Sequence, residues 1–163
     1  MKFTAQISYD ASPEAVFAML TDQAFQDRKL AATGSLEFTS EITRSGDTAV
    51  ITTHRTLPTD RVPDAFRSLV GSRLTVIQVE TWKAAAGTSR TGTVTLHVQG
   101  APLRMTGTLR LAGTTAHTTE DVDGELKASV PLIGGRIERA IEPAVRSAVE
   151  VEQRIGRDWL TAG

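Results

Sequence analysis

Apolar and polar side chains alternate over much of this chain. The alternation is clear in residues 3–9, and it returns at residue 36 and persists for about 90 residues. A period of two is typical of a β-strand that buries one face. Turn-forming residues interrupt the pattern, for example at 45–47 and 86–87. We therefore predict one strand at the start and an antiparallel meander of about six strands that ends near residue 131.

Other stretches follow a helical period instead. Ser12 and Asp22 are suited to begin two short helices directly after the first strand. Residues 62–70 have apolar side chains at helical spacing and predict a short amphipathic connector at the rim of the sheet. From residue 136 onward, apolar side chains recur every three or four positions, with charged residues between them. The pattern predicts a long C-terminal helix with one apolar face.

Small residues recur where this helix faces the predicted sheet. Ala140, Ala144 and Ala148 lie along or beside its apolar stripe, and Gly107 lies between Met105 and Leu109 in one of the strands. Small side chains at such positions either permit close packing of helix and sheet or leave a cavity between them. The residues alone leave both alternatives open.

Length and composition narrow the classes of function. The chain has 163 residues, enough for a single domain (residues 1–163) with its own core. Its net charge of −1 and its scattered basic residues argue against a nucleic-acid partner. It has no cysteine, no apolar segment long enough to span a membrane and no signal-peptide pattern. We expect a cytoplasmic protein without stable membrane insertion, present as a monomer or a weak homodimer.

Few residues suggest catalysis. None of the three histidines has metal-ligand spacing, and no nucleophile motif or phosphate-binding loop is present, so we expect neither a metal nor a cofactor. His54 fits either strand register. Glu80 and Trp82 share one face, opposite Ile77 and Val79. We expect the two aliphatic residues to point inward and Glu80 outward. In the other register Glu80 would be buried with a raised pKa and would be suited to act as a general acid. His54 and Glu80 are therefore the candidate catalytic residues if the protein is an enzyme.

Two stretches of the sequence resemble a known superfamily. ISYDASPEAVFAMLTD and the C-terminal helix are similar to the opening and closing elements of the START-like helix-grip superfamily, which includes polyketide cyclase-like and pollen-allergen-like proteins. VPDAFRSLVGSRLTVIQVETW and VPLIGGRIERAIEPAV look like an uncharacterised actinobacterial START-like family. The resemblance covers essentially the whole chain.

The resemblance implies an α+β helix-grip fold, in which a curved antiparallel sheet of about seven strands wraps around the long C-terminal helix. It also favours the cavity over close packing. An apolar cavity suits a lipid, an isoprenoid, a polyketide or an aromatic ligand. The predicted ligand-binding residues are Phe38, Ile42, Phe66, Leu69, Val70, Val94, Leu96, Met105, Leu109, Ile137, Ile141, Ala144 and Ala148.

The fold alone does not select a function, because one fold hosts many. The first hypothesis is binding or transport of a small hydrophobic molecule. The second is a cyclase or aromatase that uses a polar residue of the cavity to move a proton. The third is a protein-interaction module that pairs through edge strands or the region of Phe66.

Overall fold

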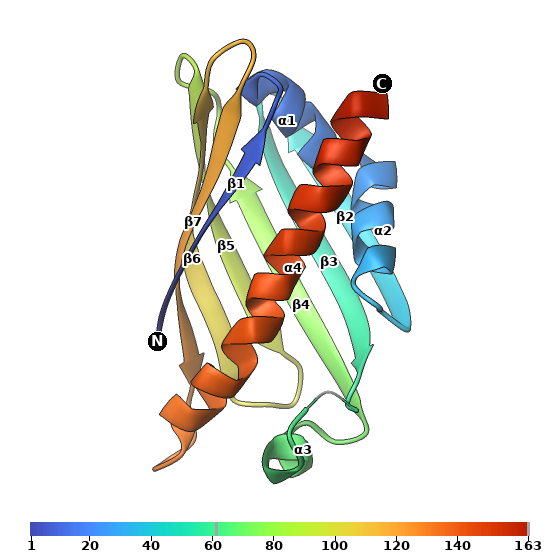
Figure 1. Ribbon diagram of the computed structural model, residues 1–163, viewed down its shortest axis with the longest axis vertical. Coiled ribbons are helices and arrows are strands. Elements are labelled where there is room, and N and C mark those ends of the chain that lie inside the picture. Colours follow the sequence, from blue (N-terminus) through green and yellow to red (C-terminus); the bar gives the residue numbers. More distant parts are fainter. Residues whose placement is uncertain (61, 163) are drawn as a thin grey trace.

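A single antiparallel sheet and four helices make up the computed structural model, which describes residues 1–60 and 62–162 (Figure 1). Strands β2 to β7 pair in sequence order, and β1 joins the far edge beside β7, which gives the order β1-β7-β6-β5-β4-β3-β2. This is the predicted α+β helix-grip architecture. The strands are β1 (Lys2–Tyr9), β2 (Glu37–Ser45), β3 (Thr48–Pro58), β4 (Arg73–Trp82), β5 (Ser89–Val98), β6 (Leu103–Gly113) and β7 (Thr118–Ala128).

Two short helices follow β1, as the sequence predicts. They are α1 (Pro13–Leu20) and α2 (Gln23–Ala32). The side chain of Ser12 accepts a hydrogen bond from the amide of Ala15 (3.2 Å), and Asp22 Oδ1 accepts one from the amide of Ala24 (2.8 Å). These caps satisfy amides that have no partner within the helix. Helix α2 then packs against β2.

The long helix α4 (Gly134–Ala162) crosses one face of the sheet diagonally (Figure 1). Its main neighbours are β1 and β7 at one sheet edge, and α1 and α2 toward the other. Near its end, Gly156 allows close approach, because a Cβ at this position would lie 2.6 Å from Cε1 of Tyr9. The helix is thus packed against one sheet edge and against the two short helices, and between these contacts it passes over the middle strands.

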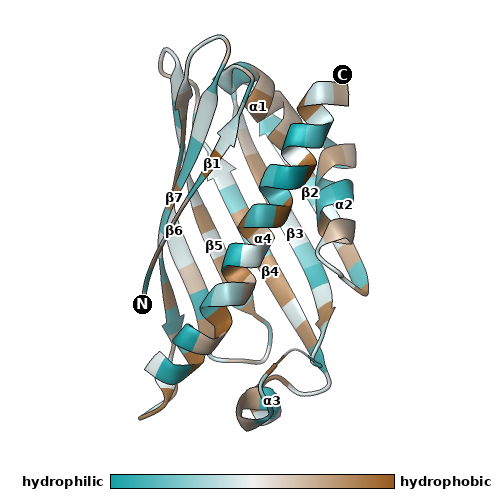
Figure 2. Cartoon of the chain, viewed as in Figure 1, coloured by the Kyte–Doolittle hydropathy of each residue, from teal (hydrophilic) through white to brown (hydrophobic). Residues whose placement is uncertain are grey.

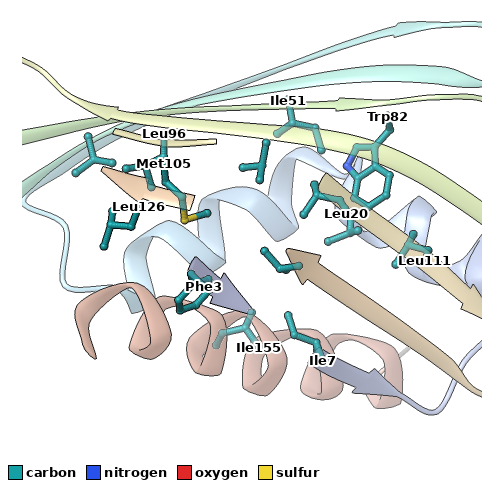
Figure 3. Packing of buried hydrophobic residues seen from close by; sticks show 14 of the residues in the cluster. Phe3, Ile7, Leu20, Ile51, Trp82, Leu96, Met105, Leu111, Leu126 and Ile155 are labelled. Atoms are coloured by element: carbon teal, nitrogen blue, oxygen red, sulfur yellow. The ribbon is translucent and has the colours of Figure 1, made fainter. Parts of the chain in front are cut away.

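Buried side chains form a continuous core between α4, the short helices and the inner face of the sheet. Trp82, Leu20 and Leu111 gather at one end, and Leu96, Met105 and Leu126 lie toward the other (Figure 3). Hydrophobic and hydrophilic residues alternate along the strands, and α4 has a largely hydrophilic outer surface (Figure 2). Most of the apolar positions of the alternating pattern therefore lie on the inner face of the sheet, and most of the polar positions lie on the outer face.

Helix α3 (Asp64–Val70) lies between β3 and β4, beyond the strand ends at the side of the molecule away from α1 (Figure 1). It corresponds to the amphipathic connector predicted at the rim, although it begins at Asp64 rather than Val62. Among the described residues, no helix has the length and apolar character needed to cross a membrane.

Candidate functional site

A cavity of about 600 Å³ lies between α4 and the inner face of the sheet. Its wall is mainly apolar and includes residues from α3 at one end. Most of the predicted ligand-binding residues line it, although their contact with a ligand stays a prediction. Those that line it are Phe66, Leu69, Val70, Val94, Leu96, Met105, Leu109, Ile137, Ile141, Ala144 and Ala148.

Phe38 and Ile42 do not line the cavity. Both are on the half-buried face of β2, and α2 packs against this strand. For example, the side chain of Ser40, which lies between them, accepts a hydrogen bond from Gln23 of α2 and donates one to Asp27 of α2 (2.6 Å). The short helix therefore occupies the space that the sequence analysis assigned to a ligand.

The expected register of β4 is wrong. Glu80 and Trp82 are buried, and Ile77 and Val79 are on the opposite, partly exposed face. Glu80 is stabilised inside because Gln78 Nε2 donates to its Oε1 (2.8 Å) and Trp82 Nε1 donates to its Oε2 (3.2 Å). Two hydrogen bonds from the same strand face make burial of this carboxyl group acceptable.

The histidines lie away from the cavity. His54 on β3 and His97 on β5 are exposed on the outer face of the sheet, and His117 is exposed in the turn between β6 and β7. The outward position of His97 confirms the prediction from its strand pattern. Of the two candidate catalytic residues, only Glu80 reaches the cavity wall. Acid-base chemistry on a ligand in this cavity therefore cannot use His54.

Around Glu80, the structure brings together charged residues from four elements. Lys29 of α2 donates to Glu152 of α4 with 2.8 Å between Nζ and Oε2, and Glu120 of β7 lies in the same group. Lys29, Glu80 and Glu120 are each at most 6% exposed. All four side chains line the cavity. The cavity thus has a polar region within an otherwise mainly apolar wall.

Burial and neighbouring charges shift the pKa values of three residues in this cluster. The pKa of Glu120 is well above its usual range, first because burial penalises the ionised carboxylate and then because Glu152 and Glu80 repel its charge. Burial also raises the pKa of Glu80, although Lys29 opposes the shift. For Lys29, burial lowers the pKa, but the carboxylates, Glu152 first, outweigh it and leave the pKa raised. The arrangement favours a charged lysine beside a protonated Glu120.

Three polar groups near this cluster have no hydrogen-bond partner in the described part of the chain. They are Oε2 of Glu120, Nε of Arg55 and the hydroxyl of Tyr9. Tyr9 is fully buried, and burial raises its pKa far above the usual range. Tyr9 therefore stays a neutral phenol. Arg55 and Glu120 line the cavity, and Tyr9 does not.

No group of three or more histidine and carboxylate side chains in residues 1–60 and 62–162 is arranged to hold a metal ion. The groups available for chemistry in the cavity are hydrogen-bond donors, carboxyl groups and two cations. They can orient a polar ligand group or exchange a proton with it.

The sequence analysis missed Lys29, Arg55, Glu120 and Glu152. Two of them had a usable signal. Glu120 alternates with the inward-facing residues Val122 and Leu126, and Glu152 falls four positions after Ala148 on the apolar face of the last helix. A carboxylic acid residue at a position where the pattern expects an apolar residue is a direct sign of a buried polar cluster.

Comparisons with known proteins agree with this architecture. Residues 4–160 match a family described as "Protein of unknown function (DUF2505)". The uncharacterised protein Rv0481c of Mycobacterium tuberculosis is 25% identical over 167 residues, and the alignment covers 98% of this chain and 96% of that protein.

Solved structures share the fold at low sequence identity. A STAR-related lipid transfer protein of Xanthomonas axonopodis has a TM-score of 0.59 at 14% identity, over 98% of this chain and 85% of that one. Norcoclaurine synthase of Thalictrum flavum also has a TM-score of 0.59, at 9% identity, over 100% of this chain and 87% of that one. These likenesses confirm the START-like helix-grip fold expected from the sequence.

Proposed function

This chain belongs to the DUF2505 family, and we propose that it binds a small hydrophobic molecule in the cavity between α4 and the sheet. The observation that carries the proposal is the cavity itself. Its volume of about 600 Å³ is within the range of about 300–1,000 Å³ that is common for small-molecule sites. Its mainly apolar wall with a few polar groups at one region is also typical of such sites.

The way in which α4 crosses the sheet supports a persistent cavity. Bulky side chains such as Ile137 and Ile155 anchor the two halves of the helix in the core. Between them, Ala140, Ala144 and Ala148 line the cavity with small side chains. The packing of α4 against β1 and β7 on one side and against α1 and α2 on the other supports the helix on both sides of the middle strands. Helix α3 bounds the same space and is suited to act as its rim or lid.

The names of the structural relatives are compatible with this proposal. One relative is named as a lipid transfer protein and the other as a synthase. The first use of the fold requires only an apolar cavity, whereas the second requires reactive groups in it. The cavity is the feature that both uses need.

A substitution that fills the cavity tests the proposal. Ala148→Trp is expected to weaken binding of the neutral apolar dye N-phenyl-1-naphthylamine by at least about 10-fold, which corresponds to about 1.4 kcal/mol. The indole would occupy the space that the dye needs. The measurement is a fluorescence titration, with thermal unfolding to show that the variant folds.

The matched control is Glu150→Trp, because Glu150 is exposed on the same helix and does not line the cavity. This variant should bind the dye like the wild type. Equal dye affinity in the wild type and in a folded Ala148→Trp variant would place the dye elsewhere and count against the cavity as the binding site.

The carboxyl cluster supports a second candidate function, proton-transfer catalysis on the bound molecule. The raised pKa of Glu120 favours its protonated form, and Glu152 from α4 pairs with Lys29 at 2.8 Å, so the cluster holds a carboxylic acid close to a carboxylate. In such a reaction Glu120 would give its proton to a ligand oxygen, while Glu152 would take one from the neighbouring carbon, so that the total number of protons is unchanged.

Deuterium exchange separates the two candidates. If the cluster catalyses proton transfer, 2-tetradecanone incubated with the protein in deuterium oxide should exchange the hydrogens beside its carbonyl group. The exchange should be roughly 10²- to 10⁴-fold slower with Glu120→Gln. A ketone that binds without exchange, as shown by NMR, would leave binding as the function.

A further inference from the structure

Arg55 is a cation on the cavity wall for which no partner is found among the described residues. On β3 it shares the inward face with Ile51, Thr53 and Leu57, while the adjacent His54 faces outward. The Nε atom of Arg55 is out of contact with solvent and makes no hydrogen bond, and none of its nitrogens forms an ion pair in residues 1–60 and 62–162. Arg55 therefore lines the cavity with at least one donor, its Nε–H, that has no partner among the described residues.

Two carboxyl groups of the polar cluster, those of Glu152 and Glu80, already have partners. Glu152 is the carboxylate whose charge acts on Arg55, but it is held by Lys29 at 2.8 Å. Glu80 accepts hydrogen bonds from Gln78 and Trp82. Glu152 and Glu80 thus have partners other than Arg55. Ile51 pairs with Glu80 across β3 and β4, and Arg55 lies four residues farther along β3, about 13 Å along an extended strand.

A guanidinium group stays protonated in proteins, and a charge held away from water without a counter-charge is unfavourable. Its planar set of N–H donors matches the two oxygens of a carboxylate. We propose that the cavity takes an amphipathic carboxylic acid, whose carboxylate is bound by Arg55 and whose hydrocarbon body lies along the apolar wall formed by β5, β6, β7 and α4. This inference rests on the proposed function, because it assumes that the cavity binds a small hydrophobic molecule.

The charges around the cavity favour a single negative charge on the ligand. The charged or ionisable lining residues that the structure describes are Lys29, Arg55, Asp60, Glu80, Glu120 and Glu152. The carboxyl groups outnumber the cations, so a doubly charged phosphate would be repelled more strongly than a carboxylate. A carboxylate on Arg55 neutralises the one cation in this set that no protein carboxylate contacts.

The apolar wall fits the rest of such a molecule. Leu57 and Val76 flank Arg55 on the inner face, and Leu96, Met105 and Leu126 line the cavity from the other strands. From Arg55 to Pro58, at the end of β3 that leads toward α3, the chain advances about 10 Å. A long hydrocarbon chain can thus place its carboxylate on Arg55 and bury most of its methylene groups in the same cavity.

The test compares an acid with the matching alcohol. Hexadecanoic acid and hexadecan-1-ol are each titrated against wild-type protein loaded with N-phenyl-1-naphthylamine at pH 8, where the acid is ionised. The acid should displace the neutral dye at a concentration roughly 10- to 100-fold lower than the alcohol, the range expected for hydrogen bonds to a charged partner. Arg55→Met should abolish this preference, and Arg55→Lys should keep part of it.

The matched control is Arg110→Met, because Arg110 is exposed on the outer face of β6 and does not line the cavity. It should retain the full preference for the acid. Equal displacement by the acid and the alcohol in the wild type would overturn the assignment of Arg55 and leave the proposed function standing. If the dye does not bind, or neither compound displaces it, the proposed function itself fails.

A second measurement keeps the inference testable if Arg55→Met does not fold. Hexadecanoic acid labelled with ¹³C at its carboxyl carbon is bound to the wild-type protein and followed by NMR as the pH is lowered. Contact with Arg55 should keep the bound carboxylate ionised to a lower pH than in the free acid. A titration midpoint that is unchanged or raised by binding would contradict the contact.

Discussion

Replacing Lys29 with methionine is expected to lower the free energy of unfolding by about 3–5 kcal/mol at pH 7, because it leaves buried carboxylates without their cation. Lys29 is 5% exposed, and its Nζ lies 2.8 Å from Glu152 Oε2. Its charge also opposes the rise that burial causes in the pKa values of Glu80 and Glu120. Methionine has a similar length and fits an apolar environment, so the main change is the lost charge. Urea denaturation of the two proteins measures the difference.

The dependence on pH has a definite sign. The pKa of Lys29 is raised on folding, so its contribution to stability is fully present below its ordinary value of 10.5 and is lost as the pH rises through the folded-state pKa. In the variant, Glu80 and Glu120 lose the cation that lowers their pKa values, so both carboxyl groups hold their protons to a higher pH and leave fewer unpaired charges as the pH falls. The stability difference between wild type and Lys29→Met should therefore shrink as the pH falls toward 4.

Two further variants test whether the loss of stability comes from the buried pair of Lys29 and Glu152 or from the removal of any positive charge on α2. Arg28→Met removes the neighbouring cation of α2, whose exposed pair with Asp158 has a distance of 4.0 Å, and should cost no more than about 1 kcal/mol. Lys29→Met combined with Glu152→Gln should recover much of the lost stability, because it also removes the unpaired charge. A loss from Lys29→Met as small as that from Arg28→Met would contradict the buried cluster.

Glu120→Gln is expected to make the protein more stable than the wild type, by an amount that grows with pH. Unfolded Glu120 loses its proton near its ordinary pKa of 4.5, whereas the folded protein retains it to well above that value. The contribution of Glu120 to stability is therefore fully present below about pH 4.5 and is lost as the pH rises toward the folded-state pKa. Glutamine stays neutral and has nearly the same shape, so it avoids this loss.

The stability difference between Glu120→Gln and wild type should increase by up to about 1.4 kcal/mol for each pH unit within this window. Denaturation between pH 4.5 and 9 measures it. Glu80 also has a raised pKa, but it is present in both proteins and largely cancels in the comparison. Glu125→Gln, at an exposed position of the same strand, should change stability by no more than about 0.5 kcal/mol. A pH-independent effect of Glu120→Gln would show that burial does not hold its proton.

Much of the fold follows from local patterns. Leu103, Met105, Leu109 and Leu111 alternate with polar residues, and all of them face inward, as the sequence predicts. The caps of α1 and α2 and the apolar stripe of α4 are also visible in the sequence, because each depends on residues only a few positions apart. The pairing of β1 with β7 joins residues far apart in the sequence. Local patterns do not predict it, and only the resemblance to a known fold does.

The polar part of the site is harder to predict, and β4 shows why. Ile77 and Val79 are more hydrophobic than Glu80, so the pattern alone turns Glu80 outward. The structure turns it inward because Gln78 and Trp82 donate hydrogen bonds to it and because Lys29, from another element, lies close by. A residue's partners across the fold can outweigh its own hydropathy, and single-strand patterns do not contain that information.

The central claim is that a small hydrophobic molecule occupies the cavity under α4, and native mass spectrometry tests it most directly. Wild-type protein incubated with N-phenyl-1-naphthylamine should show the added mass of one dye molecule, and extraction with organic solvent should remove it. The filled variant Ala148→Trp should show only the mass of the chain. If the folded wild type takes up no dye and carries no extractable apolar molecule from the cells in which it was made, the cavity is not a binding site and the account is wrong.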